Sequence, residues 1–325
     1  MLLLSPLLLA GCVTVEPRVE EGLARATAPA WALDGTRDEF RFAVSPAGDT
    51  LSMIPRVGRV IGTGVDAMVN DRIRVAFREA LGEYDPGVVV MTAVQRALEE
   101  AVDPDPTAVS PLSTTAGFNN PRDAEAARRE RLWKQGYDLL FDLETQYGLY
   151  DSDVQLRVEL GGRTRPRPEG DFLWRGRPTL TPGPLLADLS FQNILQRVVP
   201  YLNAPELTAE GDALDALRAD DAQALKDAFE KTVDAAVAGM LDSMALQRTA
   251  AGQHALGRSA FWAQDWDTAV AHLDAAQALA PEDAAIAADH GAALARTDAL
   301  DAAIAVTQAA LAQAPEYGPA HYNLA

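Results

Sequence analysis

Five arginines stand close together in a chain that is otherwise strongly acidic. They are Arg163, Arg165, Arg167, Arg175 and Arg177. Guanidinium groups bind carboxylates and phosphates in bidentate fashion, so the cluster is a candidate docking patch for an anionic lipid, a glycan or an acidic protein face. The alternative is a charged, proline-interrupted hairpin that resists unwanted edge pairing. Both interpretations place the arginines at the tip and on the return strand of one hairpin.

The remaining chemistry-bearing residues do not form a catalytic pattern. All four histidines lie after residue 253 and none is spaced as His-x-x-x-His, which argues against a metal site and leaves the earlier residues without a histidine base. Glu144 and Glu159 fall on neighbouring predicted strands, but carboxylates on the polar face of a sheet usually meet solvent. The glycines Gly58, Gly62 and Gly64 lack the lysine and spacing of nucleotide-binding loops. We therefore expect a non-enzymatic protein without metal or cofactor.

The overall charge limits the class of partner. The 325 residues contain 28 Lys and Arg against 47 Asp and Glu, a formal net charge of −19, and residues 204–325 hold 19 of the acidic but 6 of the basic groups. Such a field repels polyanions, so we expect no nucleic-acid binding. The acidic C-terminal third is either a solubilising surface or a face that selects a basic partner. No run reaches the roughly 20 apolar residues that a spanning helix needs.

The first twelve residues form a short apolar run that ends in small residues and a cysteine. Leu9-Ala10-Gly11-Cys12 resembles the lipobox of bacterial lipoproteins. The resemblance implies cleavage before Cys12 and acylation of its thiol and amine, and several acyl chains anchor a protein stably to a membrane. Val13, where inner-membrane lipoproteins often carry Asp, favours the outer membrane, facing the periplasm. No basic residue precedes the apolar run, which indicates a start upstream of Met1.

A period of 34 residues follows Gln247. Large and small residues recur together, with Gly257, Ala269 and Ala276 matched by the residues one period later. The pattern resembles the tetratricopeptide repeat (TPR), with two full copies and the start of a third. Small residues at these positions let two helices approach closely, and Pro281 ends the second helix.

The TPR resemblance implies a peptide-binding groove lined by the first helix of each pair. Arg258, Gln264 and Asp265 are the candidate groove or rim positions. The other interpretation is a repeat pair that only extends a core. Because an array needs a polar cap on its last helix, we expect either a fragment of a longer protein or a C-terminal face that docks on something.

The middle of the chain alternates strand and helix patterns. Phe40, Phe42 and Val44 share one face of a predicted strand, and Val154 to Leu160 alternate cleanly with polar residues. We expect strands at 39–45, 88–91, 139–146, 154–160 and 172–175, helices at 65–81, 94–102, 121–135, 186–199 and 212–246, and a proline-rich loop at 103–121. The last three strands, with short connections, predict an antiparallel meander.

This order of elements is similar to a periplasmic α/β domain of bacterial envelope proteins, the TolB amino-terminal and CsgG-like type. The residues that carry the likeness are 134–138, 155–160 and 172–176. The predicted fold is therefore an α+β domain with an antiparallel three-stranded meander and flanking helices, followed by an all-α TPR helical-hairpin array.

The predicted organisation has five parts: a signal peptide at 1–11, a tether at 12–37, an α+β periplasmic domain at 38–203, connecting helices at 204–247 and TPR repeats at 248–325. The expected function is an outer-membrane-anchored adaptor that binds a protein partner through the TPR groove, in envelope biogenesis or secretion. The alternative is a lipoprotein that binds peptidoglycan or polysaccharide through the arginine hairpin, with a glycan or anionic-lipid contact.

Overall fold

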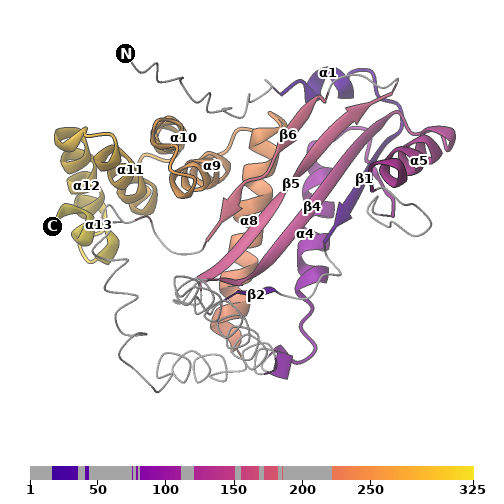
Figure 1. The fold of residues 1–325 in the computed structure, drawn as a ribbon. Helices are drawn as coiled ribbons and strands as arrows, with labels where there is room; N and C mark the ends of the chain where they lie inside the picture. Colours follow the sequence, from indigo (N-terminus) through magenta and orange to yellow (C-terminus); the bar gives the residue numbers. More distant parts are fainter. Residues whose placement is uncertain are drawn as a thin grey trace, which may run out of the picture.

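The structure is a computed structural model that describes residues 17–35, 41–43, 75, 78–79, 81–110, 121–150, 155–167, 172–181, 185 and 222–325. A mixed sheet is followed along the chain by a run of helices (Figure 1), so the predicted division into an α/β part and a helical array is correct. The predicted signal peptide, Cys12, the helix at 186–199 and most of the helix at 65–81 lie outside the described residues.

The sheet is larger than the predicted three-stranded meander. Among the described residues it contains the strands β1 Pro29–Asp34, β2 Arg41–Ala43, β3 Thr107–Ala108, β4 Leu139–Tyr150, β5 Gln155–Pro166, β6 Trp174–Gly176 and β7 Thr179–Leu180. The order is β3-β1-β4-β5-β6, with β2 also on β4 and β7 also on β5. β1 and β2 run parallel to β4, whereas β4, β5 and β6 pair antiparallel. The sheet is therefore mixed.

Strand β1 corrects the predicted tether at 12–37. Residues 29–33 are all buried, with Trp31 2% and Leu33 1% exposed. Both faces of this strand are covered, so its sequence has no polar face and lacks the alternation that marks a half-buried strand. The α/β part therefore begins well before residue 38, and Val19 of the short helix α1, Val19–Leu23, is buried in the same core as Trp31 and Leu33.

Helix α4, Pro86–Ala101, corrects the strand predicted at 88–91. Pro86 opens the helix, and the Asp85 carboxylate accepts hydrogen bonds from the amides of Gly87 and Val88. Val90 and Val94 are fully buried at helical spacing while Val88 is exposed. A capped start and a four-residue period therefore override the β-branched run, and the predicted helix at 94–102 is the second half of α4.

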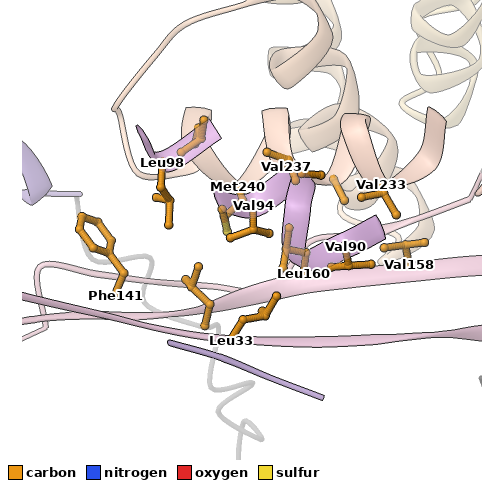
Figure 2. Close-up of a cluster of buried hydrophobic side chains, with 14 of the residues drawn as sticks. Leu33, Val90, Val94, Leu98, Phe141, Val158, Leu160, Val233, Val237 and Met240 are labelled. Atoms are coloured by element: carbon orange, nitrogen blue, oxygen red, sulfur yellow. The ribbon is translucent and has the colours of Figure 1, made fainter. Parts of the chain in front are cut away.

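One face of the sheet carries the main core. α4 and α8, Gln223–Ser243, both pack across it; Phe141 lies beside Leu98, and Val158 beside Val90 and Val233 (Figure 2). The apolar stripe predicted for residues 212–246 agrees with α8 over the described residues. On the opposite face, Leu140 packs against Leu132 and Trp133 of α5, Pro121–Lys134.

The helical array starts directly after α8. It consists of α9 Ala250–Trp262, α10 Trp266–Leu279, α11 Ala284–Arg296, α12 Leu300–Gln313 and α13 Gly318–Leu324. α9 packs on α8, so the array grows out of the helical layer that covers the sheet (Figure 1). The tight turns recur with the period: Gln264 and Asp298, one repeat apart, have φ of 61° and 59°.

The helices of each pair approach closely, as the small residues predict. A Cβ on Gly257 would lie 2.6 Å from Leu273 Cγ, and one on Gly291 would lie 2.1 Å from Thr307 Oγ1. The small residues at the periodic positions of α10 and α12 are buried; they are Ala269, Ala276, Ala303 and Ala310.

Candidate functional site

The predicted arginine cluster spans two paired strands: Arg163 and Arg165 lie on β5, and Arg175 lies on the return strand β6, as predicted. β5 continues to Pro166, where it still pairs with Leu139, so Arg163 and Arg165 are inside the sheet. They point to the face opposite the main core, and Arg163 is in register with Asp142 on β4 and Arg175 on β6. The sequence pattern ends this strand at residue 160, because two glycines then interrupt the alternation. In the structure these glycines, at 161 and 162, allow close approach of neighbouring backbone, and the second has a φ of 148°.

Most of the cluster is engaged within the protein. The Arg165 guanidinium lies 4.1 Å from the Phe172 ring centroid, and Arg167 Nη1 donates to the Trp133 carbonyl at 2.6 Å. Arg177 bridges the two strand carboxylates, with Nη2 3.3 Å from Glu144 Oε2 and Nε 3.7 Å from Glu159 Oε2. The patch therefore offers an external ligand less positive charge than the sequence indicates, although Arg175 is exposed.

A second group of polar side chains lies on α9, α11 and α13, the first helix of each successive 34-residue period of the array. We call this surface the first-helix face, formed by Arg258 and Ser259 of α9, Asp289 of α11 and Asn323 of α13. It holds part of the chain that leaves the sheet edge, which we call the strap: Thr179, Leu180, Thr181 and Leu185. Side chains from α9, α11 and α13 thus all contact the strap.

The contacts between the face and the strap are made to its backbone. Ser259 Oγ accepts the Thr179 amide at 3.0 Å, and the Arg258 guanidinium donates to the Thr181 carbonyl. Asp289 Oδ1 accepts the Leu185 amide at 2.8 Å, and Asn323 Nδ2 donates to the Leu185 carbonyl at 3.2 Å. Because these contacts bind main-chain groups, they do not depend on the sequence of the segment that they hold.

Asp289 is the centre of the face. Its side chain is 2% exposed, and its second oxygen lies 2.8 Å from His254 Nε2 and 3.6 Å from Arg258 Nε. Burial lowers the pKa of the Arg258 guanidinium from its ordinary value, against the opposing effect of Asp289. A buried carboxylate held between a histidine and an arginine is a rigid acceptor for one backbone amide.

The Leu185 side chain fills an apolar site beside Asp289. It is fully buried in a cluster with Phe261, Leu273 and Ala292. The face therefore combines polar groups that hold the main chain with an apolar site for one aliphatic side chain, which is the usual composition of a recognition surface.

A cavity of about 480 Å³ adjoins the strap between α8 and α9. Thr181 and Arg258 line its wall, and Asp227 and Lys231 of α8 contribute charged groups. The cavity and the face therefore form one continuous candidate site.

Of the three predicted groove residues, the structure brings one into this site. Arg258 binds the strap, whereas Gln264 and Asp265 form the turn before α10, where Asp265 Oδ1 accepts the Thr268 amide at 3.3 Å. Sequence reasoning missed Asp289 and Asn323. They lie one 34-residue period apart, at the position of Ala255 in the first helix, so polar residues at equal repeat positions were the signal that could have identified them.

The described residues contain neither a candidate metal site nor a candidate membrane-spanning helix. In that part of the chain no group of three or more His, Cys, Asp or Glu could hold a metal ion. No helix placed by the structure is long and apolar enough to cross a membrane.

Comparison with known proteins adds no relative. No protein-family model, curated protein sequence or solved structure matches this chain. Inference about function therefore rests on the geometry of the first-helix face.

Proposed function

We propose that this protein is a non-enzymatic adaptor that binds a partner protein's non-helical segment on its first-helix face. The observation that supports the proposal is that the face already holds such a segment, through the contacts of Arg258, Asp289 and Asn323 with backbone groups. A surface that binds main chain and buries one aliphatic side chain is suited to peptide recognition.

Two finer features of the fold belong to the same proposal. The pairs α9–α10 and α11–α12, with 34-residue spacing and equivalent turns, support TPR repeats. The antiparallel pairing of β4, β5 and β6 in chain order supports a meander at one end of the sheet.

The cellular setting is proposed from the sequence. Cys12 within Leu9-Ala10-Gly11-Cys12 supports a lipid anchor, and Val13 supports the outer membrane, with the protein facing the periplasm. The adaptor would then hold its partner at that membrane, in envelope biogenesis or secretion.

The test is affinity capture from the detergent-solubilised envelope of the producing organism. The wild-type chain is compared with a double variant, Asp289→Ala with Asn323→Ala, whose fold is checked by circular dichroism. We expect a protein partner that the wild type captures and the double variant loses, while Arg175→Glu on the sheet retains it. The same proteins on wild type and double variant would contradict the adaptor function.

Binding of peptidoglycan or polysaccharide is the second candidate. One observation favours it: Arg175 is exposed and lies beside Arg163 in the sheet register. Purified sacculi decide between the two, because Arg175→Glu should abolish sacculus binding if the sheet is the working surface. The double variant of the face should leave that binding unchanged.

A further inference from the structure

The strap occupies the surface that a partner would need. This inference rests on the proposed function and concerns its regulation and the chemistry of the partner. Asp289 Oδ1 and Asn323 Nδ2 are both directed at Leu185 of the same chain. An incoming segment cannot use these two groups while Leu185 is in place.

Leu185 defines the chemistry of a competing segment. The Asp289 carboxylate accepts its amide, Asn323 donates to its carbonyl, and its side chain is fully buried beside Phe261 and Leu273. A competitor must therefore present a free amide, a free carbonyl and an aliphatic side chain at one residue. Proline fails because it has no amide hydrogen, and charged residues fail because burial in the apolar site costs too much.

One polar group of the strap has no hydrogen-bond partner among the described residues. Thr181 is 6% exposed, and among the described residues its hydroxyl Oγ1 has no hydrogen-bond partner. A buried hydroxyl without a partner opposes the bound state of the segment that carries it. The strap is thus held less tightly than a segment with an apolar residue at this position would be.

The adjoining cavity gives a competitor room that the strap leaves unfilled. It continues from Thr181 and Arg258 to Asp227 and Lys231 of α8, with a volume of about 480 Å³. A partner segment could place a further side chain there and gain contacts that the strap does not make.

We infer that the strap is a displaceable ligand in cis: the first-helix face takes a leucine-bearing, non-helical segment of a partner protein, and it does so only when the strap leaves. The leucine of the partner takes the place of Leu185 between Asp289 and Asn323. The strap sets a threshold, since the apparent affinity for the partner is the intrinsic affinity multiplied by the fraction of molecules in which the face is open.

Release of the strap also affects β7, the short strand at the edge of the sheet from which the strap begins. The strap begins in β7, where Leu180 pairs with Val158 and the Thr179 amide is held by Ser259 of α9. Release of Thr181 from Arg258 removes the support next to β7. Binding at the array is therefore transmitted to the edge of β5, which carries the arginines on its other half.

The experiment measures binding of a fluorescein-labelled synthetic peptide with the sequence of residues 179–188 to the full chain by fluorescence anisotropy. In Leu185→Asp the strap cannot bury its side chain, so we expect peptide affinity at least about tenfold higher than for the wild type. Thr181→Val in the full chain removes the unpaired hydroxyl and should hold the strap more tightly. We therefore expect its affinity for the peptide to be about threefold or more below that of the wild type. A peptide with Asp in place of its own Leu185 should bind to neither.

Two controls locate the effect. Leu300→Asp makes the same change at a leucine that is 59% exposed, and it should bind like the wild type. Adding Asn323→Ala to Leu185→Asp should lower the affinity several-fold, because one backbone hydrogen bond is lost. Circular dichroism checks each variant. Hydrogen exchange of the wild type, in which peptide should speed exchange of the Leu185 and Thr179 amides, gives a readout that needs no substitution.

Equal affinity of wild type and Leu185→Asp, with unchanged exchange at Leu185, would overturn the inference. It would leave the proposed function standing, because the face would then bind without releasing the strap. If no variant binds the peptide, the proposed function fails as well, since an emptied face would ignore the sequence that it holds in cis.

Discussion

The sheet domain and the helical array bury apolar surface in opposite ways. The sheet core is built of large side chains such as Phe141, Phe229 and Leu143, contributed by strands and helices far apart in sequence. The array relies more on alanine and glycine, and at Gly257 and Gly291 a side chain of the next helix fills the place where a Cβ would stand. The comparison teaches that removing volume should damage the first region, whereas adding volume should damage the second.

The largest expected effect is the loss of volume in the sheet. Phe141 is fully buried in the central strand β4, and Phe141→Ala should lower the free energy of unfolding by about 3–5 kcal/mol. Urea denaturation followed by hydrogen exchange measures the effect region by region. Val88→Ala, at an exposed position of α4, is the control. If Phe141→Ala lowered the unfolding free energy of the array as much as that of the sheet, the two regions would not differ in the way proposed.

Added volume in the array should have the next largest effect. Gly257→Ala places a Cβ 2.6 Å from Leu273 Cγ and 3.2 Å from the Leu273 amide nitrogen. We expect a loss of about 1–3 kcal/mol from overpacking, in spite of the higher helix propensity of alanine. Gly318→Ala is the matched control, because nothing lies within 4 Å of its new Cβ. Thermal unfolding measures both, and equal melting temperatures would refute close packing as the basis of the array.

Acid should weaken the array through two histidines, the buried His290 and the partly buried His272. Burial lowers the pKa of His272, against the opposing charges of Asp242 and Asp265, and burial likewise lowers the pKa of His290, against Asp274. Each folded-state pKa thus lies below the unfolded value of about 6.5, so unfolding takes up protons and stability falls as the pH drops through 6.5.

The histidine effect can be removed by substitution. His272→Asn with His290→Asn retains a donor for the partners Gln253 and Gln277 and should flatten the pH dependence of the array below about pH 6.5. Melting curves in buffers across that range measure it. A slope that is unchanged in the double variant would assign the acid sensitivity to other groups.

The smallest expected effect is on the outer face of the sheet. Arg177 is 42% exposed and bridges Glu144 and Glu159, so Arg177→Met should cost no more than about 0.2–1 kcal/mol, since solvent screens exposed ion pairs. The effect should disappear in high salt. A loss of several kcal/mol in urea titration would mean that this face, like the core face, contributes strongly to the stability of the sheet.

The sequence predicted the array better than the sheet for a physical reason. Array contacts recur every 34 residues, so the small residue at Gly257 and the turn at Gln264 have visible counterparts. β1 was predicted as a tether because its burial depends on β4, more than one hundred residues away. The valine run of α4 was predicted as a strand because β-branched residues favour strands, although Asp85 and Pro86 begin a helix directly before it.

The candidate site was predictable in part. Arg258 was identified from its place on a first helix, but its partner Thr181 comes from a different region of the chain, and no local pattern connects them. The same holds for Leu185 and Asp289, which are separated by 104 positions. When a site forms between a repeat and a distant segment, the periodicity of the sequence can identify only the residues that belong to the repeat.

The two groups around Leu185 also give the face a sense of direction. The Asp289 carboxylate can only accept hydrogen bonds, and the Asn323 amide nitrogen, which is also held by the Ala288 carbonyl at 3.1 Å, can only donate them. A chain laid in the reverse orientation would set a carbonyl oxygen against the carboxylate and an amide hydrogen against the asparagine nitrogen, two repulsive contacts in place of two attractive ones. The face therefore fixes the chain direction in which a segment binds.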